Sequence, residues 1–213
     1  MKLVPSFRSS QAFSLLELLV VMAIVGALSA VAVGTFNQTL RGTRITSTAQ
    51  AVSDAMSLAR NTALARNVPV QLRFYKLPDI DLPNGAPTIY RGMQIFVCES
   101  RATNALTKPI LFPQQIVISA NAKKSSILQL TETTPGGSDP AKLSGMTYTY
   151  IFMTFGANGI VQPASNALLT STNEWYVTLQ AQRDLATDSS WPINYATVKI
   201  NPVTGSTQIF QPR

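Results

Sequence analysis

The first 36 residues show a sharp contrast between polar and apolar positions. Residues 1–12 are polar and basic, with Lys2 and Arg8 and no acidic residue. Residues 13–36 (FSLLELLVVMAIVGALSAVAVGTF) are almost wholly apolar. At a rise of about 1.5 Å per residue, a helix of this length crosses a bilayer core of about 30 Å. Because basic residues favour the cytoplasmic side, we expect a transmembrane helix with the rest of the chain on the far side of the membrane.

Beyond this run the apolar positions recur every three or four residues, which is typical of one face of a helix. The stripe consists of Ile45, Ala49, Val52, Met56, Ala59 and Ala63. Pro69 ends the pattern, since a proline disfavours helical backbone in the residue before it. We therefore expect one helix over 13–67. Its first part, 13–36, is the membrane and assembly segment, and its second part, 37–67, has a single apolar face.

After Pro69 the apolar positions follow a period of two, which indicates strands. Strand-like runs occur at 68–75, 93–99, 115–120, 126–130, 146–155, 160–162, 175–181, 195–200 and 206–210. The last two are joined by Asn201-Pro-Val-Thr-Gly205, in which Pro and Gly favour a hairpin turn. The expected fold class is α+β. An antiparallel β-sheet forms a head of residues 68–213 and packs on the second half of the helix.

Composition excludes several kinds of chemistry. The chain has no histidine, so Ser-His-Asp triads, Cys-His dyads and imidazole metal sites are excluded. Cys98 is the sole cysteine, and its apolar neighbours favour a buried small side chain over a reactive thiol. No carboxylate pair has the spacing of an acid/base catalyst. We therefore expect no enzyme and no cofactor. The net charge of +7 permits contact with anionic lipid or nucleic acid but does not require it.

One charged residue, Glu17, interrupts the apolar run. A carboxylate inside a membrane-spanning helix is costly, so it indicates a function. It lies at the fifth position of the segment that begins at Phe13. The run Ala12-Phe-Ser-Leu-Leu-Glu17-Leu-Leu-Val-Val21 resembles the signature of type IV prepilins.

This resemblance implies a role for each of three residues. In prepilins a dedicated peptidase cuts directly before the phenylalanine, here between Ala12 and Phe13, and methylates the new Phe13 amine. The retained Glu17 of one subunit then neutralises the Phe13 amine of its neighbour. That pairing sets the axial register of a helical assembly, because an unpaired buried charge is heavily penalised. Ala12 stands where the family usually has glycine.

The head resembles particular members of the same superfamily. Residues 58–72, and residues 155–159 together with 198–205, resemble minor pseudopilins of the general-secretion H / fimbrial T type. Residues 73–96 are similar to the Verru_Chthon cassette protein D group of prepilin-type proteins. The resemblance implies a minor pilin or pseudopilin of a type IV pilus or a type II secretion pseudopilus. Before assembly it would be a single-pass inner-membrane protein with a periplasmic head, and afterwards part of the pilus, the pseudopilus or the cell surface. The implied partners are other pilin subunits, prepilin peptidase, an inner-membrane assembly platform and the lipid bilayer.

Two other readings of the N-terminus stay open. An ordinary secretory signal peptide would use Ala30-Val31-Ala32 as its cleavage site and leave Val33 as the first residue. Glu17 within the apolar region argues against it. A simple membrane anchor would keep Met1.

A binding head on the same anchor is the alternative function, for example a DNA-uptake minor pilin. Its candidate phosphate contacts are Lys123, Lys124, Lys199 and Arg213, which are scattered in the sequence. No basic stripe with interleaved aromatic residues is present, so nucleic acid is possible but not favoured. The Lys123-Lys124 pair favours a solvated turn over a phosphate contact.

Asp79 and Asp81 lie between two prolines in Leu-Pro-Asp-Ile-Asp-Leu-Pro. Oxygen ligands clustered on a loop can hold Ca²⁺, but two acids without EF-hand spacing are few. A solvated loop is the favoured interpretation, and no metal site is predicted.

Overall fold

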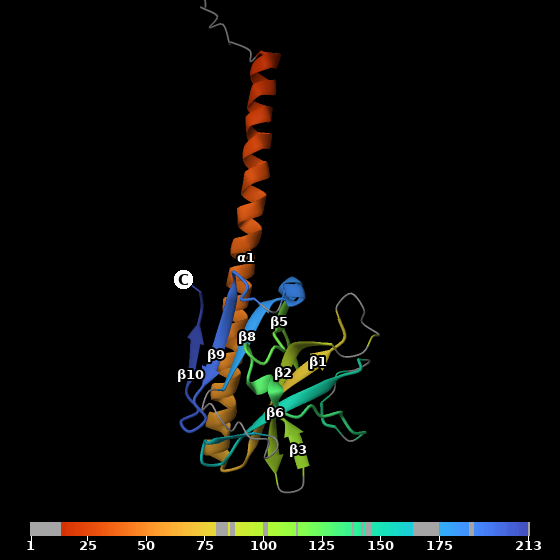
Figure 1. Cartoon of the computed structure of the whole chain (residues 1–213), viewed down its shortest axis with the longest axis vertical. Coiled ribbons are helices and arrows are strands. Elements are labelled where there is room, and N and C mark those ends of the chain that lie inside the picture. Colours follow the sequence, from red (N-terminus) through yellow and green to blue (C-terminus); the bar gives the residue numbers. More distant parts are fainter. Residues whose placement is uncertain are drawn as a thin grey trace, which may run out of the picture. The chain divides into compact units, whose positions relative to one another are not determined.

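The computed structural model describes residues 14–79, 85, 88–99, 102–113, 115–137, 139–141, 143, 146–163, 175–187 and 190–212, with the backbone alone at 30–39, 163 and 186–187. The chain divides into two compact units. The N-terminal unit is Met1–Leu40, and the C-terminal unit is Arg41–Arg213. Helix α1 contributes residues to both units (Figure 1).

Helix α1 spans Leu15–Arg66, which confirms the single helix expected over 13–67. Asn67 follows its last residue with φ of 53°. This left-handed conformation is common directly after a helix, and asparagine tolerates it better than most residues. Pro69 then lies immediately before the first strand. The helix therefore ends where the sequence predicted, through two residues that act together.

The apolar stripe of α1 faces the core of the C-terminal unit. Ile45 is 2% exposed, and the other five residues of the stripe are fully buried. Three of these five are alanines. The predicted amphipathic half of the helix is confirmed, together with its packing on the head.

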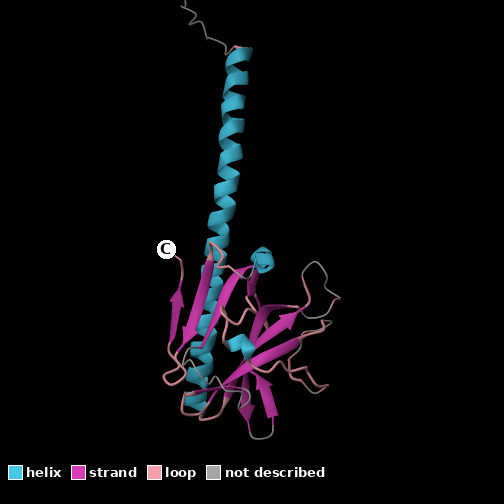
Figure 2. Cartoon of the chain, in the orientation of Figure 1, coloured by secondary structure: helices cyan, strands magenta, loops and turns pink. Residues whose placement is uncertain are grey.

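The strands of the described residues form one antiparallel sheet, ordered β10-β9-β8-β5-β2-β1-β6-β7, with β3 and β4 added to β2 (Figures 1 and 2). The α+β class is thus confirmed. The bounds are β1 Val70–Leu77, β2 Ile89–Glu99, β3 Ala102–Ala105, β4 Ile110–Leu111, β5 Ile116–Ile118, β6 Thr149–Phe155, β7 Val161–Pro163, β8 Trp175–Ala181, β9 Tyr195–Ile200 and β10 Thr207–Phe210.

The long strand β2 joins two halves of this sheet. Along one edge it pairs with β1 from Val70↔Val97 to Leu77↔Ile89. Along the other edge it pairs in turn with β5, β4 and β3. The pairing with β5 is the single residue pair Tyr90↔Ile118. The half β10-β9-β8-β5 is therefore connected to the half β2-β1-β6-β7 by little backbone hydrogen bonding, and their joint packing depends on side chains.

Most predicted strands are confirmed, and β8 and β9 have the predicted bounds. The strand predicted at 126–130 is wrong, because residues Ile127–Gln129 form the 3₁₀ helix η1. In this segment serine hydroxyls take the place of the backbone carbonyls that would accept hydrogen bonds in a strand pair. Ser125 Oγ and Ser126 Oγ each accept a backbone N–H of β8 at 3.0 Å, from Thr178 and Tyr176. The short strands β3 and β4 and the 3₁₀ helix η2, Gln182–Thr187, were not predicted.

The two faces of the sheet are buried against different partners. One face packs with the stripe of α1 in the main hydrophobic core. The other face, around β1, β2 and β6, is covered by residues that precede β6. This second cluster contains Tyr75, Leu77, Phe96, Ala141, Leu143 and Tyr150. In many antiparallel sheets one face is exposed to solvent. Strand β1 is instead buried on both faces over most of its length.

The turn between β9 and β10 depends on Gly205, whose φ is +66°. Its N–H donates to Asn201 C=O at 2.7 Å, and an added Cβ would lie 2.2 Å from Arg60 Cδ on α1. We expect Gly205→Ala to lower the free energy of unfolding by about 1–2 kcal/mol from the left-handed backbone alone. The displacement of Arg60 adds a further cost. Urea unfolding of the detergent-solubilised chain, followed by tryptophan fluorescence, measures the loss.

Two variants separate these causes. In an Arg60→Ala background the steric contribution disappears, so the Gly205→Ala penalty should shrink to its backbone part. Gly137→Ala is the matched control, because no atom lies within 4 Å of a Cβ built there. Equal losses for Gly137→Ala and Gly205→Ala would contradict the assignment.

Candidate functional site

The start of α1 holds Glu17 in a defined local geometry. Ser14 precedes the first helical residue, and its Oγ accepts the Glu17 backbone N–H at 3.1 Å. The Ser14 C=O accepts the N–H of Leu18 at 3.2 Å. The spacing Ser-x-x-Glu is that of a capping box, and an acidic residue in the first turn also complements the helix dipole. Ser14 therefore caps the start of α1, and Glu17 places a negative charge in its first turn. Sequence reasoning missed this cap, although the Ser-x-x-Glu spacing is its signal.

The described side chains of the N-terminal unit are exposed around the whole helix. Leu15 is 88% exposed, and Leu19 and Leu28 are 68% and 67% exposed. The Glu17 side chain is exposed among them. A helix that is apolar all round needs a lipid or protein partner, because its surface is unfavourable in water.

No helix in the part of the chain searched, the described residues, is long and apolar enough to cross a membrane. The predicted cleavage junction, Ala12 and Phe13, lies outside the described residues.

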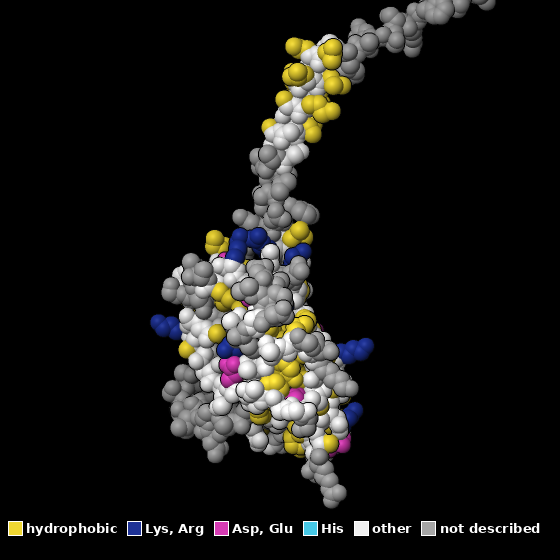
Figure 3. Space-filling model, turned by 90° about the vertical axis from the view of Figure 1, so that its right-hand side faces the viewer, with side chains coloured by type: hydrophobic (Ala, Val, Ile, Leu, Met, Phe, Trp, Pro, Cys, Tyr) yellow, Lys and Arg dark blue, Asp and Glu magenta, His cyan; other side chains and the backbone are white. Residues whose placement is uncertain are grey.

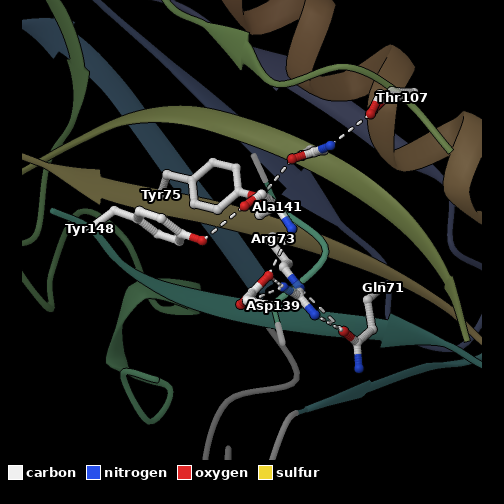
Figure 4. Close-up of polar contacts among 8 residues, drawn as sticks. Gln71, Arg73, Tyr75, Thr107, Asp139, Ala141 and Tyr148 are labelled. Atoms are coloured by element: carbon white, nitrogen blue, oxygen red, sulfur yellow. Dashed lines mark hydrogen bonds and ion pairs between the residues drawn. The ribbon is translucent and has the colours of Figure 1, made fainter. Parts of the chain in front are cut away.

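The polar centre of the head lies on the second face of the sheet, around Arg73 on β1. Its Nη1 donates to both carboxylate oxygens of Asp139, at 2.9 and 3.2 Å. The two side chains are only 7% and 5% exposed. The guanidinium also lies 4.1 Å from the ring centroid of Phe96 and 4.4 Å from that of Tyr150. Arg73 is thus a buried cation with both an ionic and an aromatic environment. Figure 4 shows its ion pair with Asp139.

Hydrogen bonds connect Arg73 and its neighbours to the segment that covers this face before β6, here called the covering loop (described residues 139–141 and 143). They also connect them to the neighbouring strands. Asp139 Oδ1 accepts the Ala141 backbone N–H at 2.8 Å, and Tyr148 Oη donates to the Ala141 C=O at 3.2 Å. On the sheet, Tyr75 Oη donates to Gln94 Oε1 at 2.7 Å, and Gln94 Nε2 donates to the Thr107 C=O at 2.7 Å. Burial raises the pKa of Tyr75 well above its usual range, although Arg73 opposes this shift. The phenol therefore stays a neutral donor.

A groove of about 510 Å³ opens beside Arg73. Its lining is formed by Arg73, Ala102, Thr103, Gly136, Asp139, Pro140 and Tyr150. The two charges in it already neutralise each other at hydrogen-bonding distance. The geometry therefore indicates a structural clamp that holds the covering loop to the sheet. The alternation of Gln71, Arg73 and Tyr75 with apolar residues could not reveal it, because Asp139 lies far along the chain.

The candidate DNA-contacting lysines have different environments. Lys123 is exposed, whereas Lys124 is 2% exposed, at variance with the solvated turn expected for this pair. Lys124 Nζ lies 3.4 Å from Gln180 Oε1 and 5.8 Å from the centroid of the Trp191 ring. Its burial follows from the packing of residues 121–125 against β8, which the local sequence does not specify.

The structure brings Lys123 and Lys199 to the same tyrosine. Tyr176 Oη donates to the Lys123 C=O at 3.3 Å, and Tyr176 pairs with Lys199 across β8 and β9. Arg213 lies outside the described residues. Two lysines beside one aromatic side chain fall short of the basic stripe that nucleic-acid binding favours.

Asp79 accepts a hydrogen bond from Gln182 Nε2 at 2.8 Å. Asp81 lies outside the described residues. Within the part of the chain that the structure describes, no group of three or more His, Cys, Asp or Glu residues could hold a metal ion.

Cys98, predicted as a buried small side chain, is half-buried at the end of β2. Burial raises the pKa of its thiol, which outweighs the opposing hydrogen bond with Thr103 and the positive charge of Arg73. The thiol is therefore less readily ionised than a free cysteine, and thiolate is the reactive form.

Residues 7–33 match the family described as the prokaryotic N-terminal methylation motif. No curated protein matches the chain. Among solved structures, a crystal structure of the type IV minor pilin FimU from Pseudomonas aeruginosa (strain PAO1) is similar to this chain with a TM-score of 0.41. The identity is 14% over 79% of this chain and 92% of that chain. The motif match covers the N-terminal segment and does not reach the head.

Proposed function

We propose that the chain is a minor pilin or pseudopilin, a structural subunit that assembles through its N-terminal helix into a type IV pilus or a type II secretion pseudopilus. The observation that carries this proposal is the match to the N-terminal methylation motif over residues 7–33. That match encloses the Ala12–Phe13 junction and Glu17 at the fifth position after it. The exposed apolar surface of the N-terminal unit supports the proposal, since it needs a lipid or subunit partner.

In this proposal the prepilin enters the inner membrane through residues 13–36, with its leader 1–12 in the cytoplasm. Prepilin peptidase removes the leader and methylates the Phe13 amine. The helix then leaves the lipid for a bundle of equivalent helices on an inner-membrane assembly platform. There the Glu17 carboxylate of one subunit neutralises the Phe13 amine of the next, and the head 68–213 stays on the periplasmic side.

The head needs no catalytic chemistry for this role. Its buried Arg73–Asp139 ion pair and its second hydrophobic cluster hold segments of the head together. No described cluster of basic residues favours nucleic acid as a partner over pilin subunits.

The N-terminus of the mature protein tests the proposal. We expect mass spectrometry of membrane-extracted protein to find a chain that begins at N-methylated Phe13, because the peptidase cuts before that residue. A chain that begins at Val33 would indicate an ordinary signal peptide, and an uncut Met1 would indicate a simple anchor. Either result contradicts the proposal.

Ala12→Gly is the matched variant for this measurement. Glycine is the residue usual at this position in prepilins, so the processed fraction should equal or exceed that of the natural chain. A strain without prepilin peptidase supplies the control, in which the leader 1–12 should stay attached.

A further inference from the structure

One end of the C-terminal unit combines exposed apolar side chains with arginines. Trp191 is 53% exposed and Ile193 is 90% exposed, both in the loop that leads into β9. A cleft of about 100 Å³ links this loop to the first turns of α1 within the unit, since Gly42, Ile45, Asn194 and Tyr195 all line it. Arg41 and Arg44 lie on these turns. Figure 3 shows basic side chains beside hydrophobic ones at the upper end of this unit.

Trp191 is held in place rather than loosely exposed. Its ring lies 4.8 Å from that of Tyr195, centroid to centroid, and Lys124 Nζ lies 5.8 Å from its centroid. Ile193, two residues on, has almost its whole side chain in solvent. An ordered tryptophan beside a fully exposed isoleucine is a costly arrangement in water, unless another surface covers it.

The part of this surface that lies on α1 is basic. No acidic residue occurs between Glu17 and Asp54, whereas Arg41 and Arg44 lie in this interval. Asp188, three residues before Trp191, lies outside the described residues. Basic residues next to an apolar segment are attracted to anionic headgroups, and tryptophan favours the membrane interface.

Arg41 follows the apolar run closely along the chain. The run ends at Phe36, five residues before Arg41. Five residues extend at most about 18 Å, so a membrane segment that ends at Phe36 keeps Arg41 within reach of the headgroup layer.

We propose that the surface formed by Arg41, Arg44, Trp191 and Ile193 docks on the anionic lipid headgroups of the membrane that holds the N-terminal helix. This surface binds lipid before assembly and must leave it when the subunit enters a filament. The proposal rests on the membrane insertion included in the proposed function.

Fluorescence of the full chain in liposomes tests this docking. The chain has two tryptophans, and Trp175 is buried at 5% exposure. In Trp175→Phe the fluorescence reports Trp191 alone. With vesicles of phosphatidylcholine and phosphatidylglycerol that carry bromines near the headgroup end of the acyl chains, we expect strong quenching of Trp191. In the reverse variant, Trp191→Phe, the buried Trp175 should be little quenched. Quenching of both alike would overturn the proposal, since it would indicate an unfolded head on the lipid.

Charge and apolar contact are tested in the same single-tryptophan chain. Arg41→Gln and Arg44→Gln should each weaken association with the anionic surface by about 5-fold, and omission of phosphatidylglycerol should act in the same direction. Ile193→Asn should lower quenching. Its matched control is Val203→Asn, because Val203 is 70% exposed but follows the other end of β9. If quenching stays the same in Arg41→Gln, in Arg44→Gln and without phosphatidylglycerol, the proposed role of anionic headgroups is wrong.

Resistance of the chain to carbonate extraction separates this inference from the proposed function. If the chain is inserted but Trp191 is not quenched, the docking surface is wrong and the subunit proposal stands. If the chain does not insert at all, both fail.

Discussion

Glu17→Gln should exclude the chain from filaments while leaving the start of α1 intact. Glutamine keeps the helix cap, because Ser14 Oγ accepts the backbone N–H of residue 17, which the substitution does not change. It cannot neutralise the Phe13 amine of a neighbouring subunit. A charge left unpaired inside a packed bundle costs about 3–5 kcal/mol, which corresponds to more than a 100-fold loss of incorporation. The measurement is the ratio of subunit in sheared filaments to subunit in membranes, by immunoblot.

Ser14→Ala is the matched control for this prediction. It removes the Oγ that accepts the Glu17 N–H but keeps the carboxylate. Loss of a helix cap costs about 1 kcal/mol, so assembly should continue at a slightly reduced level. Mass spectrometry must show that both variants are still cut before Phe13. If Ser14→Ala and Glu17→Gln are equally defective, the helix cap explains the requirement for Glu17, and the register role is wrong.

Arg73→Leu should be the most destabilising single change in the head. It leaves Asp139, 5% exposed, without its cation, and removes the guanidinium from between Phe96 and Tyr150. Breaking a buried ion pair by removing one partner costs about 3–5 kcal/mol. The residues around Asp139 also lose their ion pair with β1. Urea unfolding of the detergent-solubilised chain gives the change in free energy.

The neighbouring pair Lys76–Glu132 provides a matched comparison. Both cations lie on β1, and both pairs have a shortest N–O distance of 2.9 Å. The Lys76 and Glu132 side chains are 26% and 37% exposed, so water screens them. We expect Lys76→Met to cost at most about 1 kcal/mol. Similar losses for Arg73→Leu and Lys76→Met would show that burial does not control the strength of these pairs.

A double variant distinguishes the unpaired charge from lost packing. Asp139→Asn keeps an oxygen that can accept the Ala141 N–H but removes the negative charge. In Arg73→Leu/Asp139→Asn no buried charge is left alone, so the loss should be smaller than the sum of the single changes. Additive losses would indicate that the aromatic contacts of Arg73, and not its ionic partner, stabilise the site.

The local sequence determined the helix, most of the strands and the N-terminal motif. A period of three to four residues placed the stripe from Ile45 to Ala63 on one face of α1, and Pro69 ended the helix. A period of two gave β8 and β9 their bounds. The motif at residues 7–33 is a continuous stretch, so it too can be recognised from the sequence alone. These features depend on residues a few positions apart, whose geometry is fixed by the repeat of the helix or strand.

The tertiary structure decided where polar residues are buried. Residues 126–130 have a strand-like pattern, yet serine hydroxyls bind the edge of β8 and the segment forms η1. Arg73 looks like an ordinary exposed strand residue until Asp139, 66 positions away, covers it. Lys124 becomes buried through contacts with Gln180 and Trp191. The cost of burying a polar group depends on its partner, and a partner distant in sequence leaves no local periodicity to detect.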